Sequence, residues 1–232
     1  MNRDLEFYIE NLAGLEFFKN LSSEDLTAVK ANSIIHQYSK GQILFFQQDL
    51  LNYYYFVLKG YVKLDRRDSE DRFFYVDYIK ENSFFPYRNF AHNNYYGYSA
   101  VTKTDVDLLL LPKALFESVI GHNYDQLLLM YNQLAHILNY HELRIQMTLI
   151  SSAYDRVIQT VSLLKYDMAK TEGKEAVIHC PITINEIAEY AGTTRETAGK
   201  VMRNLVEEGR LSYSHKIICY LDTDYFDRLI ET

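Results

Sequence analysis

The sequence predicts an α+β protein in which an antiparallel β-roll, a long helix and a group of short helices with a hairpin follow one another. Short aromatic and β-branched runs fill residues 33–111, as strands require. A stretch without proline or glycine then occupies residues 122–152. These patterns divide the chain into three expected segments, 1–120, 121–152 and 153–232.

The first segment is expected to begin with helices and continue as strands. Apolar residues recur at helical spacing over residues 1–32, and Ser22 or Ser23 before two acidic residues is typical of a helix start. Turn signals such as Lys40-Gly41 separate the later runs, which favours an antiparallel sandwich or barrel. The expected strands are Ser33–Gln37, Ile43–Phe46, Tyr53–Leu58, Tyr61–Leu64, Phe73–Ile79 and Val106–Leu111.

The second segment, His122–Ser152, is expected to be one helix that follows a shorter helix opened by Pro112. Apolar residues recur in it in steps of four and three, which is the heptad pattern of a two-stranded coiled coil. The length of the stretch favours a dimer, although the stripe could instead pack on the chain's own sandwich. The expected dimer interface is Leu127, Tyr131, Leu134, Leu138, His141 and Ile145.

The third segment is expected to open with a helix over Tyr154–Ala169, a polar loop over Lys170–Lys174 and a strand over Ala176–His179. Further along, Arg210–Leu221 has the pattern of a β-hairpin. Two short helices are expected between the strand and the hairpin.

The two short helices have the most specific pattern in the chain. Thr183 and Glu186 match a capping box at the start of the first helix. Gly192 fits a sharp turn that needs a positive φ, and either of the threonines that follow it can cap the second helix. The apolar face of the second helix is expected to consist of Ala198, Val201, Met202 and Leu205. Together these spacings describe a helix-turn-helix, which the hairpin makes winged.

The second helix is expected to carry base-contacting residues on its exposed side, because the N-terminal half of such a helix enters the major groove. Arg195 and Lys200 can donate to guanine, and Glu196 can accept from cytosine N4. Expected contacts to the DNA backbone come from Thr183, Thr193, Thr194, Thr197, Arg203 and Lys216.

The charge balance weighs against this interpretation without excluding it. The formal net charge is -7, and the charges between Thr183 and Lys216 nearly cancel. An Arg-Glu pair on a helix is usually a solvated surface feature. The motif geometry, and the doubling of contacts in a dimer, nevertheless favour double-stranded DNA as the partner. Neither a signal peptide nor a membrane span is expected, so we predict a cytoplasmic protein.

Three stretches resemble the CRP/FNR family of transcription regulators. The strongest is GTTRETAGKVMRNLVEEGRL, and YSKGQILFFQ and YYFVLKGYVKL are weaker matches. The resemblance implies a jelly-roll, cyclic-nucleotide-binding-like sensor domain, a long dimerisation helix, a winged helix-turn-helix and a contact with RNA polymerase during activation or repression. It also implies that Arg195, Glu196 and Lys200 read TGTGA-type half-sites of an inverted repeat. The stretch FFPYRNF is similar to the arginine-deiminase-pathway regulators of this family.

The sensor segment departs from the family members that bind cyclic nucleotides. Pro86 and Tyr87 stand where those members have the glycine and glutamate of the phosphate-binding cassette. We therefore expect no cAMP binding, no cofactor and no metal. A small anionic effector is one hypothesis, and a pocket filled by its own side chains, in a protein without an effector, is the other. The residues concerned are Tyr87, Arg88, Tyr96 and Tyr98.

Other classes of protein are alternatives. A cupin-like small-molecule enzyme would need clustered metal ligands, and the seven histidines are scattered along the sequence. A protein-interaction module remains an alternative use of the C-terminal helices. Cys180 and Cys219 are too few for a disulfide framework, but they could form a redox pair if their strands are neighbours.

Overall fold

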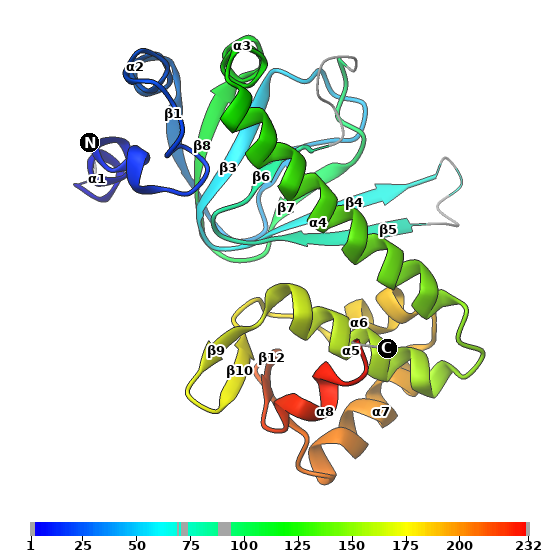
Figure 1. The fold of residues 1–232 in the computed structure, drawn as a ribbon. Helices are drawn as coiled ribbons and strands as arrows, with labels where there is room; N and C mark the ends of the chain where they lie inside the picture. The colour runs from blue at the N-terminus through cyan, green and yellow to red at the C-terminus, as the bar shows by residue number, and fades with distance from the viewer. Residues whose placement is uncertain (1–2, 69, 71–73, 88–93, 231–232) are drawn as a thin grey trace. The chain divides into compact units, whose positions relative to one another are not determined.

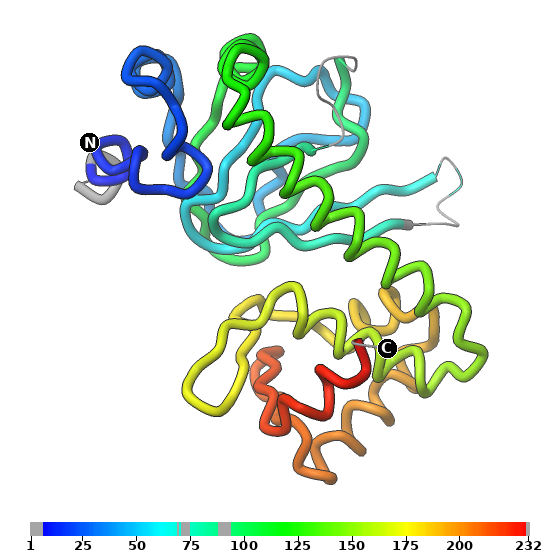
Figure 2. Tube along the Cα trace, viewed as in Figure 1, coloured from blue at the N-terminus to red at the C-terminus, as the bar shows by residue number. Residues whose placement is uncertain are grey.

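The computed structural model describes residues 3–68, 70, 74–87 and 94–230. The chain has an α+β fold in two compact units, Met1–Leu134 and Ala135–Thr232 (Figure 1). Figure 2 follows the same path as a tube from the N-terminus to the C-terminus. Each unit has its own buried core, and they are described separately below.

The N-terminal unit contains two four-stranded antiparallel sheets, ordered β1-β8-β3-β6 and β2-β7-β4-β5. This is the expected β-roll. The strands β6 and β7 were not predicted, because runs of two and four residues are too short to show a period. The strands are β1 (Ile34–Tyr38), β2 (Ile43–Phe45), β3 (Tyr53–Lys59), β4 (Val62–Arg67), β5 (Phe74–Ile79), β6 (Phe84–Phe85), β7 (Ser99–Thr102) and β8 (Val106–Pro112).

Helices precede the strands of this unit in the chain and also follow them. The first 32 residues are not continuously helical, since turns occupy the segment between Gly14 and Ser22. Ser22, not Ser23, caps α2, because its hydroxyl accepts the Asp25 N–H at 3.0 Å. The helices are α1 (Arg3–Glu10), η1 (Leu12–Gly14), α2 (Ser23–Asn32) and α3 (Lys113–His122).

Aromatic rings fill the core of the N-terminal unit. Phe17, in the turn segment, stacks with Phe116 of α3 at a centroid distance of 6.1 Å. Phe116 in turn stacks on Tyr54 of β3 at 4.1 Å. The turns that break the N-terminal helix therefore serve to bring Phe17 and Phe18 into the core, where both are buried.

The long helix α4 (Tyr124–Thr148) belongs to both units and is shorter than the predicted span of His122–Ser152. Asn123 has an extended backbone, and its side-chain oxygen accepts the Gln126 N–H at 3.0 Å, so it caps the helix start. At the other end, Ser152 accepts the Asp155 N–H and caps the next helix instead. Residues that satisfy caps in this way end a helix that periodicity alone would extend.

The C-terminal unit combines helices with one four-stranded antiparallel sheet of order β11-β12-β10-β9. The predicted loop over Lys170–Lys174 is confirmed for Gly173 and Lys174, which form a turn, but is wrong for Lys170–Glu172, which forms the edge strand β9. Charged residues are common on such edges. The short α8 was not predicted. The elements are α5 (Ala153–Met168), β9 (Lys170–Glu172), β10 (Glu175–Ile178), α6 (Ile184–Ala191), α7 (Arg195–Glu207), β11 (Leu211–Ser214), β12 (Ile217–Tyr220) and α8 (Thr223–Asp227).

A glycine between β3 and β4 limits what the N-terminal unit tolerates. Gly60 has a φ of 89°, and a Cβ added there would lie 2.4 Å from the carbonyl oxygen of Asp105. Gly41 has a similar φ of 86° but has nothing within 4 Å of an added Cβ. The two glycines thus separate backbone strain from steric conflict.

We expect Gly60→Ala to lower the free energy of unfolding more than Gly41→Ala. In both variants the free energy of unfolding falls by about 1–2 kcal/mol, because a residue with a side chain must adopt a left-handed backbone. In Gly60→Ala the steric clash lowers it by about 1–3 kcal/mol more. Urea unfolding followed by circular dichroism measures the difference. Equal losses for the two variants would contradict the close packing at Gly60.

Candidate nucleic-acid interface

The turn between α6 and α7 has the local chemistry that the sequence predicts. The Thr183 hydroxyl accepts the Glu186 N–H at 3.2 Å, and Glu186 accepts the Thr183 N–H at 2.9 Å, so the capping box is present. Gly192 adopts the left-handed conformation, with φ 58° and ψ 49°. Thr194, not Thr193, caps α7 by accepting the Thr197 N–H at 3.2 Å. The two helices are therefore joined by a short and fully specified turn.

The helix α7 has one buried and one exposed face. Its buried face consists of Ala198, Val201, Met202 and Leu205, as predicted. The three residues expected to contact bases, Arg195, Glu196 and Lys200, are all exposed, and so is Arg203 one turn further along. The leading edge of α7 thus presents two cations and one carboxylate to the outside of the unit.

A groove of about 690 Å³ runs beside the exposed face of α7. Gly199 of α7 and Tyr213 of the wing are among the residues that line it. The Tyr213 hydroxyl donates to the carbonyl of Ile182 at 2.8 Å, which fixes the wing strand to the segment before α6. The groove is lined by Ile184, Arg195, Glu196, Gly199, Met202, Arg203, Val206 and Tyr213.

The remaining residues expected at the DNA backbone lie around this face. Lys216 is exposed at the tip of the wing, where it and His215 have positive φ values of 69° and 52°. Such angles are those of a tight hairpin turn. Thr193 and Thr197 are half-buried, and Thr183 combines its capping role with partial exposure.

Polar contacts between residues distant in the sequence join the two ends of the wing to each other and to α8. An Arg210 guanidinium N–H, after α7, donates to the Asp222 carboxylate after β12, and this hydrogen bond lowers the pKa of Asp222. The guanidinium also lies 4.5 Å from the centre of the Tyr225 ring. Asp222 caps α8 in the structure, and no local spacing in the sequence pairs it with Arg210.

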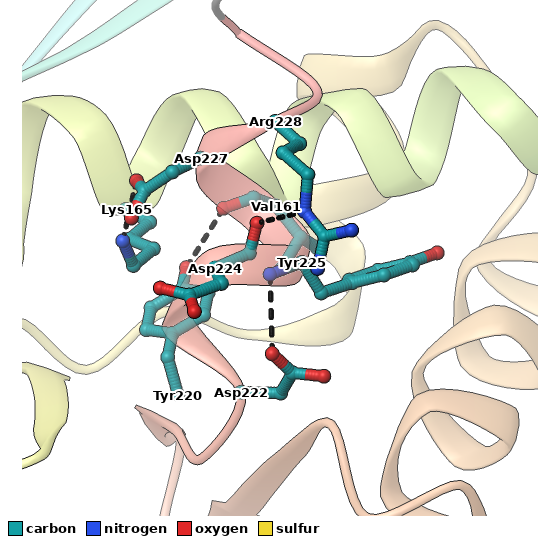
Figure 3. Close-up of polar contacts among 8 residues, drawn as sticks. All are labelled: Val161, Lys165, Tyr220, Asp222, Asp224, Tyr225, Asp227 and Arg228. Carbon is teal, nitrogen blue, oxygen red and sulfur yellow. Dashed lines mark hydrogen bonds and ion pairs between the residues drawn. The ribbon is translucent and has the colours of Figure 1, made fainter.

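The base of the wing is anchored on α5, as Figure 3 shows. The buried Tyr220 hydroxyl donates to the carbonyl of Val161 at 2.8 Å. Lys165 of α5 donates to the Asp227 carboxylate of α8 at 2.6 Å. The wing therefore has a fixed position within the C-terminal unit, on the same support as α7.

The stripe predicted as a dimer seam is largely unburied. Leu127, Tyr131, Leu138 and Ile145 have exposed fractions of 43%, 66%, 59% and 62%. Leu134 is only half-exposed because it packs against the core of the N-terminal unit. His141 is also half-buried, with its ring 5.6 Å from that of Tyr140. Four of the six seam residues are thus exposed to solvent in the part of the chain that the structure describes.

The residues of the expected effector pocket are tied to other parts of the N-terminal unit. The Tyr87 hydroxyl donates to the buried carboxylate of Asp77 at 2.5 Å. Burial, and then the Asp77 charge, raise the pKa of Tyr87. The buried Tyr96 stacks on Phe45 at 3.6 Å and donates to the carbonyl of Tyr53 at 2.9 Å. Tyr98 is fully buried, and Arg88 lies outside the described residues.

Sequence profiles assign both units. That of the cyclic nucleotide-binding domain matches residues 35–123, and that of the Crp-like helix-turn-helix domain matches residues 155–229. The chain belongs to the CRP/FNR family. One relative, the HTH-type transcriptional regulator ArcR of Staphylococcus aureus (strain Newman), is 26% identical to this regulator over 221 residues, 93% of this chain and 90% of the relative.

Solved structures share the fold of this CRP/FNR regulator. FixK2 from Bradyrhizobium japonicum is 16% identical with a TM-score of 0.71, covering 85% of this chain and 96% of its own. TTHA1359, a CRP/FNR-family regulator from Thermus thermophilus, is 23% identical with a TM-score of 0.58, covering 86% and 99%. The chain is a CRP/FNR-type transcription regulator with a DNA-binding helix-turn-helix.

The enzyme alternative gains nothing from these findings. Over residues 3–68, 70, 74–87 and 94–230, no three His, Cys, Asp or Glu side chains gather as a metal site requires. Across the same residues, no helix combines the length and the apolar character that crossing a bilayer needs.

The two cysteines differ in their surroundings within the C-terminal unit, and neither is in a disulfide. Cys219 of β12 lies opposite Val177 of β10 and is partly exposed, whereas Cys180 is buried and lies two residues after the end of β10. Burial, and then a hydrogen bond to the Glu175 carboxylate, raise the pKa of the Cys219 thiol to about 11. The raised pKa of Cys219 therefore opposes a reactive thiolate.

We expect Cys219 to react slowly with iodoacetamide at pH 8. Because its pKa is raised above the ordinary value, the thiolate fraction at pH 8 is small, and alkylation should be at least about tenfold slower than for free cysteine. Mass spectrometry over time measures the rate, with urea-unfolded protein as the control. A rate equal to that of the unfolded control, or a loss of two hydrogens after diamide treatment, would revive the redox hypothesis.

Proposed function

We propose that this regulator binds an inverted-repeat operator as a homodimer, with Arg195, Glu196 and Lys200 reading bases in the major groove. The observation that carries the proposal is the exposed leading edge of α7. An arginine and a lysine can each donate to guanine, and a carboxylate can accept from cytosine N4. The family resemblance adds a TGTGA-like half-site, and Thr183, Thr193, Thr194, Thr197, Arg203 and Lys216 are the proposed backbone contacts.

The dimer is proposed to form along the exposed stripe of α4. Apolar residues at heptad spacing bury each other when two such helices pair. Leu127, Tyr131, Leu138 and Ile145 offer exposed apolar area of the kind that marks an interaction surface. A two-fold axis along this seam would place two recognition helices about 34 Å apart, one helical turn of DNA.

We also propose that the regulator does not respond to cyclic nucleotides. A phosphate entering beside Tyr87 would approach the buried Asp77 carboxylate, and like charges repel strongly away from water. Aromatic packing by Tyr96 and Phe45 supports the hypothesis that the pocket is filled by the protein itself. Contact with RNA polymerase, as the family resemblance implies, would convert operator binding into activation or repression.

The dimer proposal predicts that Leu138→Asp dissociates the protein. An unpaired carboxylate in an apolar seam costs roughly 3–5 kcal/mol, so the dimer dissociation constant should rise by at least 100-fold. Sedimentation velocity over a concentration series measures it. Asn139→Asp is the matched control, because it adds the same charge at the neighbouring exposed position and should leave the dimer intact. Unchanged association of Leu138→Asp would refute this seam.

The operator proposal predicts different effects for two arginines of α7. Duplexes selected from a random pool by the wild-type protein provide the operator. Arg195→Ala should weaken operator binding by about 1–3 kcal/mol per half-site and leave binding to random DNA almost unchanged. Arg203→Ala should weaken binding to both, and reduce the slope of log K against log salt by about one per protomer.

Titrations by fluorescence anisotropy at several salt concentrations measure both effects. Selection of duplexes without an inverted repeat would contradict the homodimer. Equal losses on operator and random DNA for Arg195→Ala would contradict base reading by that residue.

A further inference from the structure

A tyrosine pair joins the end of α4 to the first helix of the helix-turn-helix. Tyr140 of α4 and Tyr190 of α6 are both 5% exposed, and their hydroxyls are hydrogen-bonded to each other. One turn further along α4, the guanidinium of Arg144 lies 3.7 Å from the centre of the Tyr190 ring. This is the geometry of a cation–π contact. Tyr190 lies two residues before Gly192. The cluster therefore contacts the end of α6, next to the turn that leads to α7.

A second contact ties the turn to the connection after α4. Arg156, near the start of α5, donates to the carbonyls of Ala191 and Gly192 at 3.1 and 3.2 Å. The same guanidinium donates to the carbonyls of Ile150 and Ser151 at 2.8 and 3.0 Å. The planar guanidinium thereby satisfies carbonyl groups from two separate chain segments. This side chain therefore links the connection after α4 to the turn before α7.

The tyrosine cluster and the dimer seam use different faces of α4. At about 100° per residue, the cluster residues Tyr140 and Arg144 lie roughly 130° around the helix from the seam residues Leu138 and Ile145. Both surfaces can therefore be occupied at once. Because α7 begins three residues after Gly192, its direction depends on how α6 is held, and α6 is held on α4 through Tyr190.

We propose that Tyr140, Arg144, Tyr190 and Arg156 are positioning residues that set the spacing between the two half-sites of the operator. They fix the orientation of α7 relative to the C-terminal part of α4. In a dimer that pairs through α4, this orientation determines the separation of the two recognition helices. The inference rests on the proposed homodimer. A shift of one base pair in the spacer turns one half-site by about 35°, which a rigid pair of helices cannot follow.

The test compares duplexes whose central spacer is shortened or lengthened by one or two base pairs from the selected operator. The wild-type protein should prefer the selected spacer by at least about tenfold per base pair. The double variant Tyr140→Phe/Tyr190→Phe, which lacks both hydroxyls, should discriminate by less than about threefold. Arg144→Gln should do the same, whereas Arg144→Lys, which keeps the cation, should retain the preference.

Tyr166→Phe is the matched control, since Tyr166 is an exposed tyrosine of α5. The variant keeps the ring, which lies 6.0 Å from that of His136, and loss of the hydroxyl should not change the spacer preference. Thermal unfolding verifies that each variant is folded, and the Arg144 pair remains available if the double variant is not. Equal weakening on every spacer, or an unchanged preference, would overturn the positioning role. A wild-type protein without any spacer preference would instead overturn the homodimer proposal, and this inference with it.

Discussion

The DNA-binding unit depends on one constraint, the short left-handed turn at Gly192 between α6 and α7. A helix that ends leaves carbonyl groups without partners, and here the Arg156 guanidinium satisfies two of them from α5. The Thr193 N–H closes the turn on the carbonyl of Ala188 at 3.0 Å. With the turn fixed, the buried face of α7 determines which residues remain outside, and Arg195 is among them.

The N-terminal unit keeps the cyclic nucleotide-binding-domain fold of its family but differs from the cyclic-nucleotide-binding members in the residues of the phosphate-binding cassette. Cyclic-nucleotide-binding members offer a glycine and a glutamate where this chain has Pro86 and Tyr87. The Tyr87 hydroxyl is engaged by the carboxylate of Asp77, which also accepts the Tyr75 hydroxyl at 2.8 Å. In the proposed pocket, a buried carboxylate would favour hydrogen-bond donors and cations over a phosphate, so the fold alone does not determine the ligand.

Structural features that depend only on neighbouring residues could be predicted from the sequence. The capping box at Thr183 and the turn at Gly192 need only neighbouring residues, and both were predicted. The pairing of Tyr140 with Tyr190 joins positions 50 residues apart, and periodicity marks each of them only as apolar. The same holds for Arg210 and Asp222. Strand β9 was taken for a loop because its pairing with β10, not its composition, makes it a strand.

The balanced charge of the stretch from Thr183 to Lys216 bears on the proposed role of its orientation. Basic and acidic residues offset each other between Thr183 and Lys216, so nonspecific attraction to phosphates supplies little affinity. In the proposed dimer, binding would then come from a few well-placed contacts, each of them present twice. Contacts made by a second unit contribute fully only if it reaches its half-site without strain. A regulator with few cations therefore has more to gain from rigid connections such as Tyr140–Tyr190 than one with a broad basic surface.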